Sequence, residues 1–346
     1  MVLLPVGISF YTFQAISYIV DVYRGDIKPL RSIIDFGFYL SFFPQLIAGP
    51  IVRASEFIPQ IQRPYTLNAR EAGHALFLIL IGLFKKIILS DYLALNLVDR
   101  VFDNPVAYSG VENLMASYGY TLQIYCDFSG YTDIAIGIAL LLGYRLALNF
   151  NFPYKAASLT DFWRRWHISL SSWLRDYLYI PLGGSRHGRL VMWMSLTLTM
   201  LLGGLWHGAD WTFVFWGLAH GLGLVVSKLI DRLPRPFLEQ RGVRIARRVL
   251  CFHYVVFLWI FFRATNFEHA MQVLGQIVGA FDIRHLSQFV TAYWAASLLL
   301  LLGYGLHWMP SQWIERARGN FISLHWVWKF AVTLAVVLIV LRVQTA

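Results

Sequence analysis

The chain has 346 residues, of which 58% are hydrophobic and 14% are charged, and its formal net charge is +10 at pH 7. A soluble domain carries about 25% charged residues, so this chain has too little polar surface to cover a globule in water and is predicted to lie in a lipid bilayer. The positive charge does not indicate nucleic-acid binding, because the basic residues are spread through loops and form no basic stripe. Anionic lipid headgroups and the cytoplasmic side of a membrane account for them better.

Runs of about 20 apolar residues predict the helices that cross the bilayer. Such runs lie at 74–95, 115–144, 190–207, 211–228, 290–309 and 322–341, with less apolar candidates at 3–20, 33–49 and 249–262. The 115–144 run is too long for one helix and contains Asp127, Ser129, Gly130 and Asp133. We therefore expect a break there, facing protein or a wet cavity, because irregular backbone is not tolerated against lipid.

The segment 155–189 differs from these runs because tryptophan and tyrosine alternate with arginine and aspartate. That composition predicts interfacial or re-entrant helices that line a cavity. The sequence contains no internal repeat and no long linker, so we expect one domain over residues 1–346.

The densest basic cluster predicts the orientation of the chain. It runs from Lys228 to Arg248, and a short loop this positive belongs on the cytoplasmic side. Arg186 and Arg189 precede the 190–207 run. The runs 190–207 and 211–228 should then form a helical hairpin whose two outer ends lie on the cytoplasmic side, with His207 near its turn.

Histidines inside an apolar chain are the first candidates for chemistry, because each buried ionisable group costs several kcal/mol. His167 follows W-R-R-W, and His207 stands in L-G-G-L-W-H-G, where glycines leave space beside the ring. An imidazole can take or give a proton near neutral pH. A helix-packing role for His207 is the alternative. For His220, an interhelical hydrogen bond is favoured over catalysis.

Other side chains leave alternatives open. Arg164 and Arg165 suit either lipid headgroups or an anionic donor, because guanidinium groups bind phosphate. Asp127 either caps the expected helix break or orients a histidine. Lys85 and Lys86 either extend to the membrane interface, which is favoured, or point into a cavity. No H-x-x-x-H, H-E-x-x-H or G-x-S-x-G pattern occurs, so we expect neither a metal site nor a serine-hydrolase elbow.

Seven stretches together resemble a known family. They are L-P-V-G-I-S-F-Y-T-F-Q-A-I-S-Y-I-V-D-V-Y-R at the start, F-F-P-Q-L-I-A-G-P-I-V-R at 42–53, Y-C-D-F-S-G-Y-T-D-I-A-I-G at 125–137, N-F-N-F-P-Y at 149–154, D-F-W-R-R-W-H-I-S-L-S-S-W-L-R-D-Y-L-Y-I-P-L-G-G at 161–184, G-G-L-W-H-G-A-D-W-T-F-V-F-W-G-L-A-H-G at 203–221, and W-I-F-F-R-A at 259–264. The chain resembles the membrane-bound O-acyltransferase (MBOAT) family. The likeness is strongest to its bacterial branch that serves alginate O-acetylation and teichoic acid D-alanylation.

The resemblance implies an all-α bundle of tilted transmembrane helices around a central funnel, in the bacterial inner membrane. The family's invariant histidine falls on His207 and its second histidine on His167. The implied reaction is O-acyl transfer, most simply of acetyl from acetyl-CoA as a substrate, with no bound cofactor. The acceptor would be an extracytoplasmic polysaccharide such as alginate, reached directly or through a secreted acyltransferase partner. Relatives carry further helices before the first matching stretch, so we expect the chain to lack that N-terminal portion.

Within this scheme, His207 is expected to act as general base on the acceptor hydroxyl, while His167 polarises the thioester carbonyl or stabilises the developing oxyanion. The basic residues at 228–248 and 186–189 are expected to attract the donor's phosphates. Substrate contacts are expected from the charged and polar residues near the two histidines, namely Asp127, Arg164, Arg165, Trp166, Ser169, Arg175, Asp176, Trp206 and His220.

Two other function classes compete with acyl transfer. A transporter or flippase of an envelope precursor also contains broken helices and intramembrane charges. The two halves of this chain lack matching interrupted segments, which argues against it. A structural scaffold would not depend on His207 at all.

Overall fold

The computed structural model describes residues 7–46 and 49–345, and every regular element in these ranges is helical. The predicted all-α fold is confirmed. The first part contains α1 (Ile8–Arg24), α2 (Ile33–Ser41), η1 (Phe43–Gln45), α3 (Ala54–Ile61), α4 (Ala69–Leu83), the π-helical segments η2 (Phe84–Asp91) and η3 (Ala94–Val98), α5 (Asp99–Asp103), η4 (Pro105–Ala107) and α6 (Gly110–Leu141).

The second part begins with short elements and continues with long helices. It contains η5 (Pro153–Lys155), α7 (Leu159–Trp163), α8 (Ile168–Leu174), the π-helical η6 (Arg175–Tyr179), α9 (Gly188–His207), α10 (Trp211–Ile230), α11 (Arg235–Leu238), α12 (Arg241–Arg263), α13 (Phe267–Gly279), α14 (His285–Ala292), α15 (Trp294–Trp308), α16 (Ser311–Ser323) and α17 (Trp326–Thr345).

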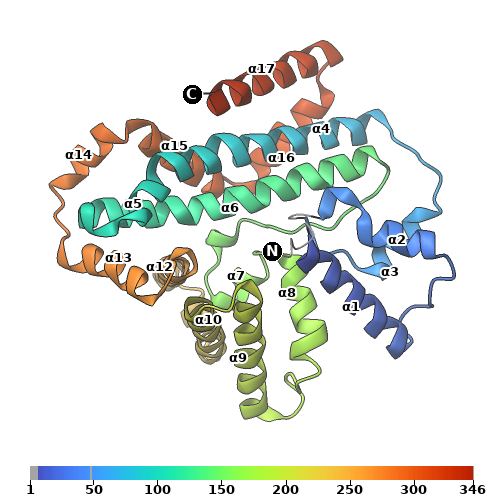
Figure 1. The fold of residues 1–346 in the computed structure, drawn as a ribbon, viewed down its shortest axis with the longest axis horizontal. Coiled ribbons are helices and arrows are strands. Elements are labelled where there is room, and N and C mark those ends of the chain that lie inside the picture. Colours follow the sequence, from blue (N-terminus) through green and yellow to red (C-terminus); the bar gives the residue numbers. More distant parts are fainter. Residues whose placement is uncertain (1–6, 47–48, 346) are drawn as a thin grey trace, which may run out of the picture.

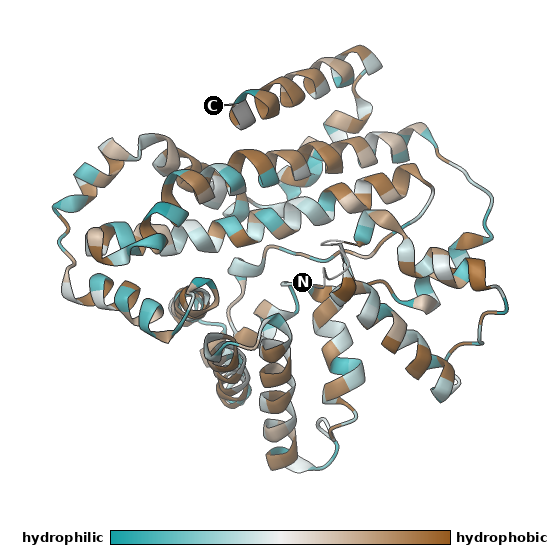
Figure 2. Cartoon of the chain, viewed as in Figure 1, coloured by the Kyte–Doolittle hydropathy of each residue, from teal (hydrophilic) through white to brown (hydrophobic). Residues whose placement is uncertain are grey.

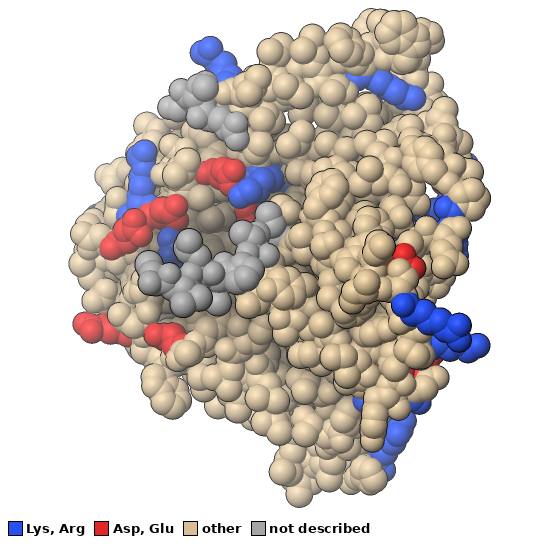
Figure 3. Space-filling view, turned by 45° about the vertical axis from the view of Figure 1, so that its right-hand side comes forward, with Lys and Arg blue, Asp and Glu red and all other residues tan. Residues whose placement is uncertain are grey.

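Two groups of helices define the architecture. The α4–η2 helix lies side by side with α6, and α17 packs on its outer side (Figure 1). The α9–α10 hairpin, α8 and α1 extend away from this layer in one direction. The helices α9, α10 and α17 are largely apolar along their length (Figure 2), and most of the face in Figure 3 carries uncharged side chains.

Among the described residues, the helices long and apolar enough to cross a membrane are Ala69–Asp103, Gly110–Leu141, Gly188–His207, Trp211–Ile230, Arg241–Arg263 and Trp326–Val343. They confirm the predicted runs at 74–95, 190–207, 211–228, 249–262 and 322–341, and the hairpin that ends its first arm at His207. A 32-residue helix covers most of the 115–144 run.

The predicted break in that run is wrong, because α6 is continuous from Gly110 to Leu141. Its carboxylates do not interrupt the helix because they pair with the neighbouring helix. Asp133 accepts from Lys85 at 2.7 Å, and Asp127 accepts from Lys86 at 2.5 Å. Both lysines therefore pair with carboxylates of α6, and Asp127 lies within a continuous helix and caps no break.

Local geometry explains how these lysines reach their partners. Lys86 also bonds Asp91, five residues later, at 2.8 Å. Residues five apart share a face in a π-helix, which is the conformation of η2. A β-carbon on Gly82 would lie 2.5 Å from the carbonyl oxygen of Gly130. The two glycines thus let the backbones approach closely enough for the ion pairs to form.

Two further apolar runs differ from their predictions. The 290–309 run is not one straight helix, since α14 and α15 meet at 94°. Buried Phe289 holds α14 against the core, where it packs on α6. The 33–49 run is not one helix either, because α2 ends at Ser41 and Pro44, which lacks a backbone N–H, follows in η1. Residues 47–48 of this run, and 3–6 of the 3–20 run, lie outside the described residues.

The α9–α10 hairpin depends on small residues at its contact. A β-carbon on Gly204 would lie 2.3 Å from the carbonyl oxygen of Phe213, and one on Gly217 would lie 2.4 Å from that of Met200. Any larger residue would separate the helices. Asp210 then begins α10, accepting from the N–H of Thr212 at 2.9 Å. These contacts fix His207 beside the turn.

The Lys85–Asp133 pair gives a stability prediction. Asp133→Leu should lower the free energy of unfolding by about 3–5 kcal/mol, because it leaves a buried ammonium without its partner. The double variant Lys85→Met/Asp133→Leu should recover most of that loss. Thermal unfolding in detergent measures both. Arg284→Ala, which removes an exposed pair with Asp282, is the control and should change little. A double variant no more stable than Asp133→Leu would contradict this account.

Candidate functional site

His167 stands at the junction between α7 and α8 in a strained backbone conformation. Its φ is +42°, in the left-handed region that non-glycine residues rarely adopt. The Ile168 N–H donates to the carbonyl of Asn149 at 2.9 Å, which ties the junction to the 149–154 loop. Such strain costs about 1–3 kcal/mol and persists only where the surroundings impose it. The loop therefore fixes where the His167 ring lies.

The His167 ring is enclosed by aromatic side chains and is 3% exposed. Its centroid lies 4.6 Å from that of Phe128, 6.4 Å from Phe150 and 6.5 Å from Phe10. Burial, together with a smaller contribution from a charge on His207, lowers the pKa of His167 to about 3. The imidazole is therefore neutral at pH 7.

Asn149, which lies in the loop before η5, holds the polar side of this ring. Its Oδ1 lies 3.2 Å from Nδ1 of His167, 3.1 Å from the backbone N of Ser169 and 2.9 Å from the Ser169 Oγ. Ser169 Oγ in turn accepts from the N–H of Ile51 at 2.9 Å. Sequence reasoning missed Asn149. Its only signal was its position in the N-F-N-F-P-Y stretch.

His207 has a different environment at the end of α9. Its ring centroid lies 4.6 Å from that of Trp206, 5.0 Å from Phe262 and 5.4 Å from Trp216. Neither ring nitrogen hydrogen-bonds to any described residue. Among the described residues, the contacts of this imidazole are with aromatic rings.

The structure brings the two histidines into one region. Phe10 of α1 stacks on His167, and Phe13 of the same helix packs on Trp206 at 5.0 Å. The helix α1 therefore contacts both His167 and Trp206, the residue that precedes His207.

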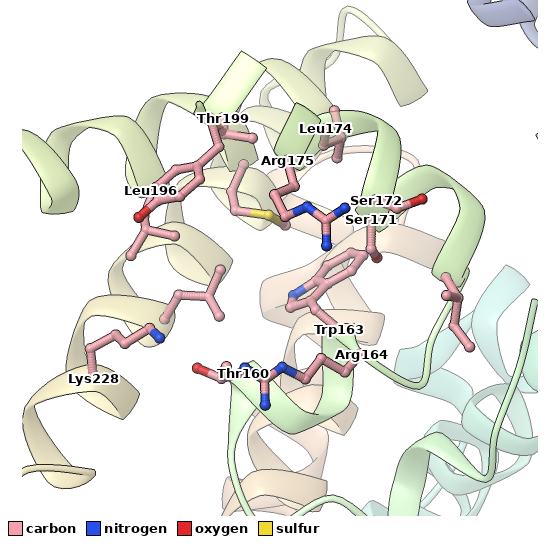
Figure 4. Close-up of a pocket in the computed structure, with 14 residues that line it drawn as sticks. Thr160, Trp163, Arg164, Ser171, Ser172, Leu174, Arg175, Leu196, Thr199 and Lys228 are labelled. Carbon is pink, nitrogen blue, oxygen red and sulfur yellow. The ribbon is translucent and has the colours of Figure 1, made fainter. Parts of the chain in front are cut away.

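A first cavity of about 350 Å³ lies between α7, α8 and the hairpin. Arg164, Arg175 and Lys228 come from three different helical segments and direct their cationic groups toward it (Figure 4). Trp163 and several aliphatic side chains form much of the remaining wall. The combination suits a ligand with an anionic part and an apolar part.

A second cavity of about 460 Å³ lies on the other side of α8 and shares Ile168, Ser172 and Arg175 with the first. Its lining includes Asp176, which pairs with Arg53 at 3.1 Å and with Arg175 at 2.7 Å. Ser169 also lines this cavity and connects it to Asn149. Neither histidine lines either cavity.

The predicted substrate contacts thus separate into groups. Arg164 and Arg175 line the first cavity, and Ser169, Arg175 and Asp176 line the second. Arg165 instead pairs with Asp161 at 2.8 Å. Asp127 belongs to the Lys86 ion pair and is not orienting either histidine.

The two tryptophans of W-R-R-W are buried and pack against other helices. Trp166 is buried and packs on Trp259 at 5.0 Å, rather than lying at a membrane interface. Trp163 donates through Nε1 to Nδ1 of His220 at 3.3 Å. The predicted interhelical hydrogen bond of His220 is therefore present, between α7 and α10. The described residues contain no group of three or more His, Cys, Asp or Glu side chains placed to hold a metal ion.

The chain is similar in sequence to several known proteins. The chain is 41% identical over 314 residues to a peptidoglycan O-acetyltransferase of Helicobacter pylori, covering 83% of this chain and 59% of that protein. It is 45% identical over 282 residues to the "Probable alginate O-acetylase AlgI" of Pseudomonas syringae pv. tomato, covering 81% of this chain and 52% of that protein.

A more distant relative is the teichoic acid D-alanyltransferase of Bacillus subtilis, 28% identical over 289 residues, or 76% of this chain and 69% of that protein. The chain thus spans little more than half the length of the two O-acetylation relatives. The model of the membrane-bound O-acyltransferase family, MBOAT, matches residues 27–267, which include both histidines, Asn149 and both cavities' shared helix α8. The chain is a multi-pass membrane protein that belongs to the MBOAT family.

Proposed function

We propose that this chain transfers an acetyl group from a cytoplasmic thioester to a hydroxyl of an extracytoplasmic polysaccharide. The observation that carries the proposal is a neutral, buried imidazole at His167, whose Nε2 has no partner among the described residues, in the same region as His207. A free ring nitrogen that is shielded from water can exchange a proton with a reacting oxygen. The printed names of the relatives, O-acetyltransferase and O-acetylase, support the same reaction.

The chemistry needs no bound cofactor. The acceptor oxygen attacks the acyl carbon and forms a C–O bond, the hydroxyl proton passes to an imidazole, and the C–S bond breaks. The departing thiolate then takes that proton, so atoms and charge balance. General acid–base catalysis of this kind contributes about 10²- to 10⁴-fold, and alignment of the two substrates adds to it.

The first cavity supports acetyl-CoA as the donor. Arg164, Arg175 and Lys228 provide cationic groups for its phosphates, and the apolar wall suits its pantetheine arm. Of the basic residues at 228–248, Lys228 is the one that lines this cavity. The donor proposal therefore centres on the cavity rather than on the whole loop.

The basic residues at the two outer ends of the α9–α10 hairpin support the proposed orientation. Basic residues near the start of α9 and the end of α10 favour the cytoplasmic side of the bacterial inner membrane for these two helix ends. The turn of the hairpin, and His207 with it, would then lie toward the outer half of the bilayer. An acetyl group received there could pass to a polysaccharide such as alginate, directly or through a secreted acyltransferase.

His207→Ala should lower the rate of acetyl transfer about 10²-fold or more, because it removes an imidazole that can take part in acid–base catalysis. The protein should still insert into the membrane and fold, because the ring makes packing contacts but no hydrogen bond among the described residues. Membrane vesicles supplied with labelled acetyl-CoA and acceptor glycan measure covalent label. His253→Ala is the matched control, since that histidine bonds Tyr118 outside the site. Unmodified glycan crossing the membrane without label would instead indicate a transporter. Full acetylation by the His207 variant would contradict the proposal.

Lys228→Glu should raise the Michaelis constant for acetyl-CoA about 10- to 10²-fold with little change in kcat, because a charge-assisted contact contributes roughly 1.5–3 kcal/mol. Arg241→Glu reverses a nearby exposed charge that does not line the cavity, and should leave that constant within about twofold. Initial rates at varied donor concentration measure both. Equal changes in the Michaelis constant in the two variants would contradict the proposal that the first cavity binds the donor.

A further inference from the structure

We propose that the surface beside the turn of the α9–α10 hairpin binds a neutral, hydroxyl-rich glycan. This surface, the glycan ledge, lies between Trp211 of α10, Glu268 of α13 and Asn104 before η4. The inference rests on the proposed acyl transfer and narrows the class of its acceptor to uncharged sugars, rather than polyuronates such as alginate.

Two adjoining hollows form the glycan ledge. One has a volume of about 500 Å³ and lies between Trp211 and the start of α13. The other has a volume of about 370 Å³ and reaches from the start of α13 to Asp103 and Asn104 at the end of α5. Asn266 and Glu268 line both hollows, so a chain of several sugars can contact the two together.

Aromatic packing fixes the ledge beside the hairpin turn. Phe267 lines the first hollow and packs on Phe215 of α10 and on Phe261 of α12, with ring centroids 5.4 Å apart in both cases. The next ring of α12, Phe262, lies 5.0 Å from that of His207. The ledge is therefore attached to the helix ends that pack around His207, and in the proposed orientation it faces the extracytoplasmic side.

Trp211 supplies an apolar platform on this ledge. It is 75% exposed, and its ring stacks on no other ring in the described part of the chain. An indole offers a large, rigid apolar face. The C–H groups on one side of a pyranose ring pack on such a face, while the hydroxyls of the sugar point outward from its rim. A sugar that stacks on Trp211 would therefore direct its hydroxyls toward the neighbouring polar side chains.

Those polar side chains are available to a ligand. Asp103, Asn104, Glu268 and Gln272 are exposed, and their side chains form no hydrogen bond or ion pair with any described residue. A carboxylate only accepts hydrogen bonds, an amide donates and accepts, and a sugar hydroxyl does both. The ledge can therefore bind several neighbouring hydroxyls without first breaking contacts within the protein.

The charge of the ledge discriminates between glycans. Asp103, Asp210 and Glu268 line the two hollows, and none of the described lining residues is Lys or Arg. Arg263 at the end of α12 is already paired with Asp99 at 2.8 Å. A polyuronate carries a carboxylate on every sugar and would meet like charge here, as would an anionic lipid headgroup. An uncharged glycan meets no such repulsion.

Binding of two oligosaccharides of equal length tests the inference without using acetyl transfer. The full chain, in nanodiscs of a zwitterionic lipid, is titrated calorimetrically with cellohexaose, which is neutral, and with a hexamer of guluronate. Cellohexaose should bind at least tenfold more tightly at low ionic strength, where repulsion between charges is least screened. Equal affinities, tighter binding of the guluronate hexamer, or no binding of cellohexaose would overturn the inference.

Substitutions of Trp211 separate stacking on a sugar from anchoring at the membrane interface. Trp211→Ala should weaken cellohexaose binding at least tenfold, whereas Trp211→Phe keeps an aromatic face and should stay within about threefold of the original. Trp326→Ala is the matched control, because Trp326 is 70% exposed at the start of α17 and lines neither hollow. Equal losses in the two alanine variants would show that Trp211 has no specific role and would contradict the ledge.

A charge reversal tests the discrimination between glycans. Glu268→Lys should tighten binding of the guluronate hexamer about tenfold, because it replaces a repulsive contact with an attractive one. Glu239→Lys reverses an exposed charge that lines neither hollow, and should leave that affinity within about twofold. The same affinity in both variants would refute the role of charge.

The ledge and the proposed function fail in different ways. Acetyl transfer to a glycan by a chain that does not bind cellohexaose would refute the ledge and leave the acyltransferase proposal standing. Binding with the expected dependence on Trp211, but without any acetyl transfer, would refute the proposed function instead.

Discussion

The cost of leaving a polar group unpaired away from water determines much of this structure. In a bilayer, a buried charge or hydrogen-bonding group is tolerated only when the protein supplies its partner. The chain meets this requirement between helices, where Lys85 and Lys86 of the α4–η2 helix pair with carboxylates of α6. The Lys85–Asp133 and Lys86–Asp127 pairs therefore hold the two longest helices of the layer together while satisfying their charges.

Hydropathy predicted the elements that face lipid and failed where partners come from a distant part of the chain. The helical hairpin at 188–230 was predictable from its two apolar runs and from the basic residues at their outer ends. The continuity of α6 did not, because Asp127 and Asp133 look like helix interruptions until their lysines, more than 40 residues earlier, are placed beside them. Polar residues in an apolar run therefore have two meanings, and a single sequence does not separate them.

The site was predictable to a similar degree. His167 and His207 are rare residue types for their surroundings, and the resemblance to the MBOAT family pointed to them. Asn149 carries no such signal, because an asparagine in a loop usually serves a turn. The three cations of the first cavity lie just after α7, at the start of η6 and in α10, and their convergence depends on tertiary packing.

The two histidines differ in how their positions are determined. His167 has a left-handed backbone and its Nδ1 lies 3.2 Å from Asn149 Oδ1, whereas the described side chains that pack on His207 are aromatic. A left-handed conformation at a non-glycine residue costs about 1–3 kcal/mol and persists only where the surrounding structure imposes it. The position of the His167 ring is therefore determined by the 149–154 loop and α8, and that of the His207 ring by the packing at the end of α9.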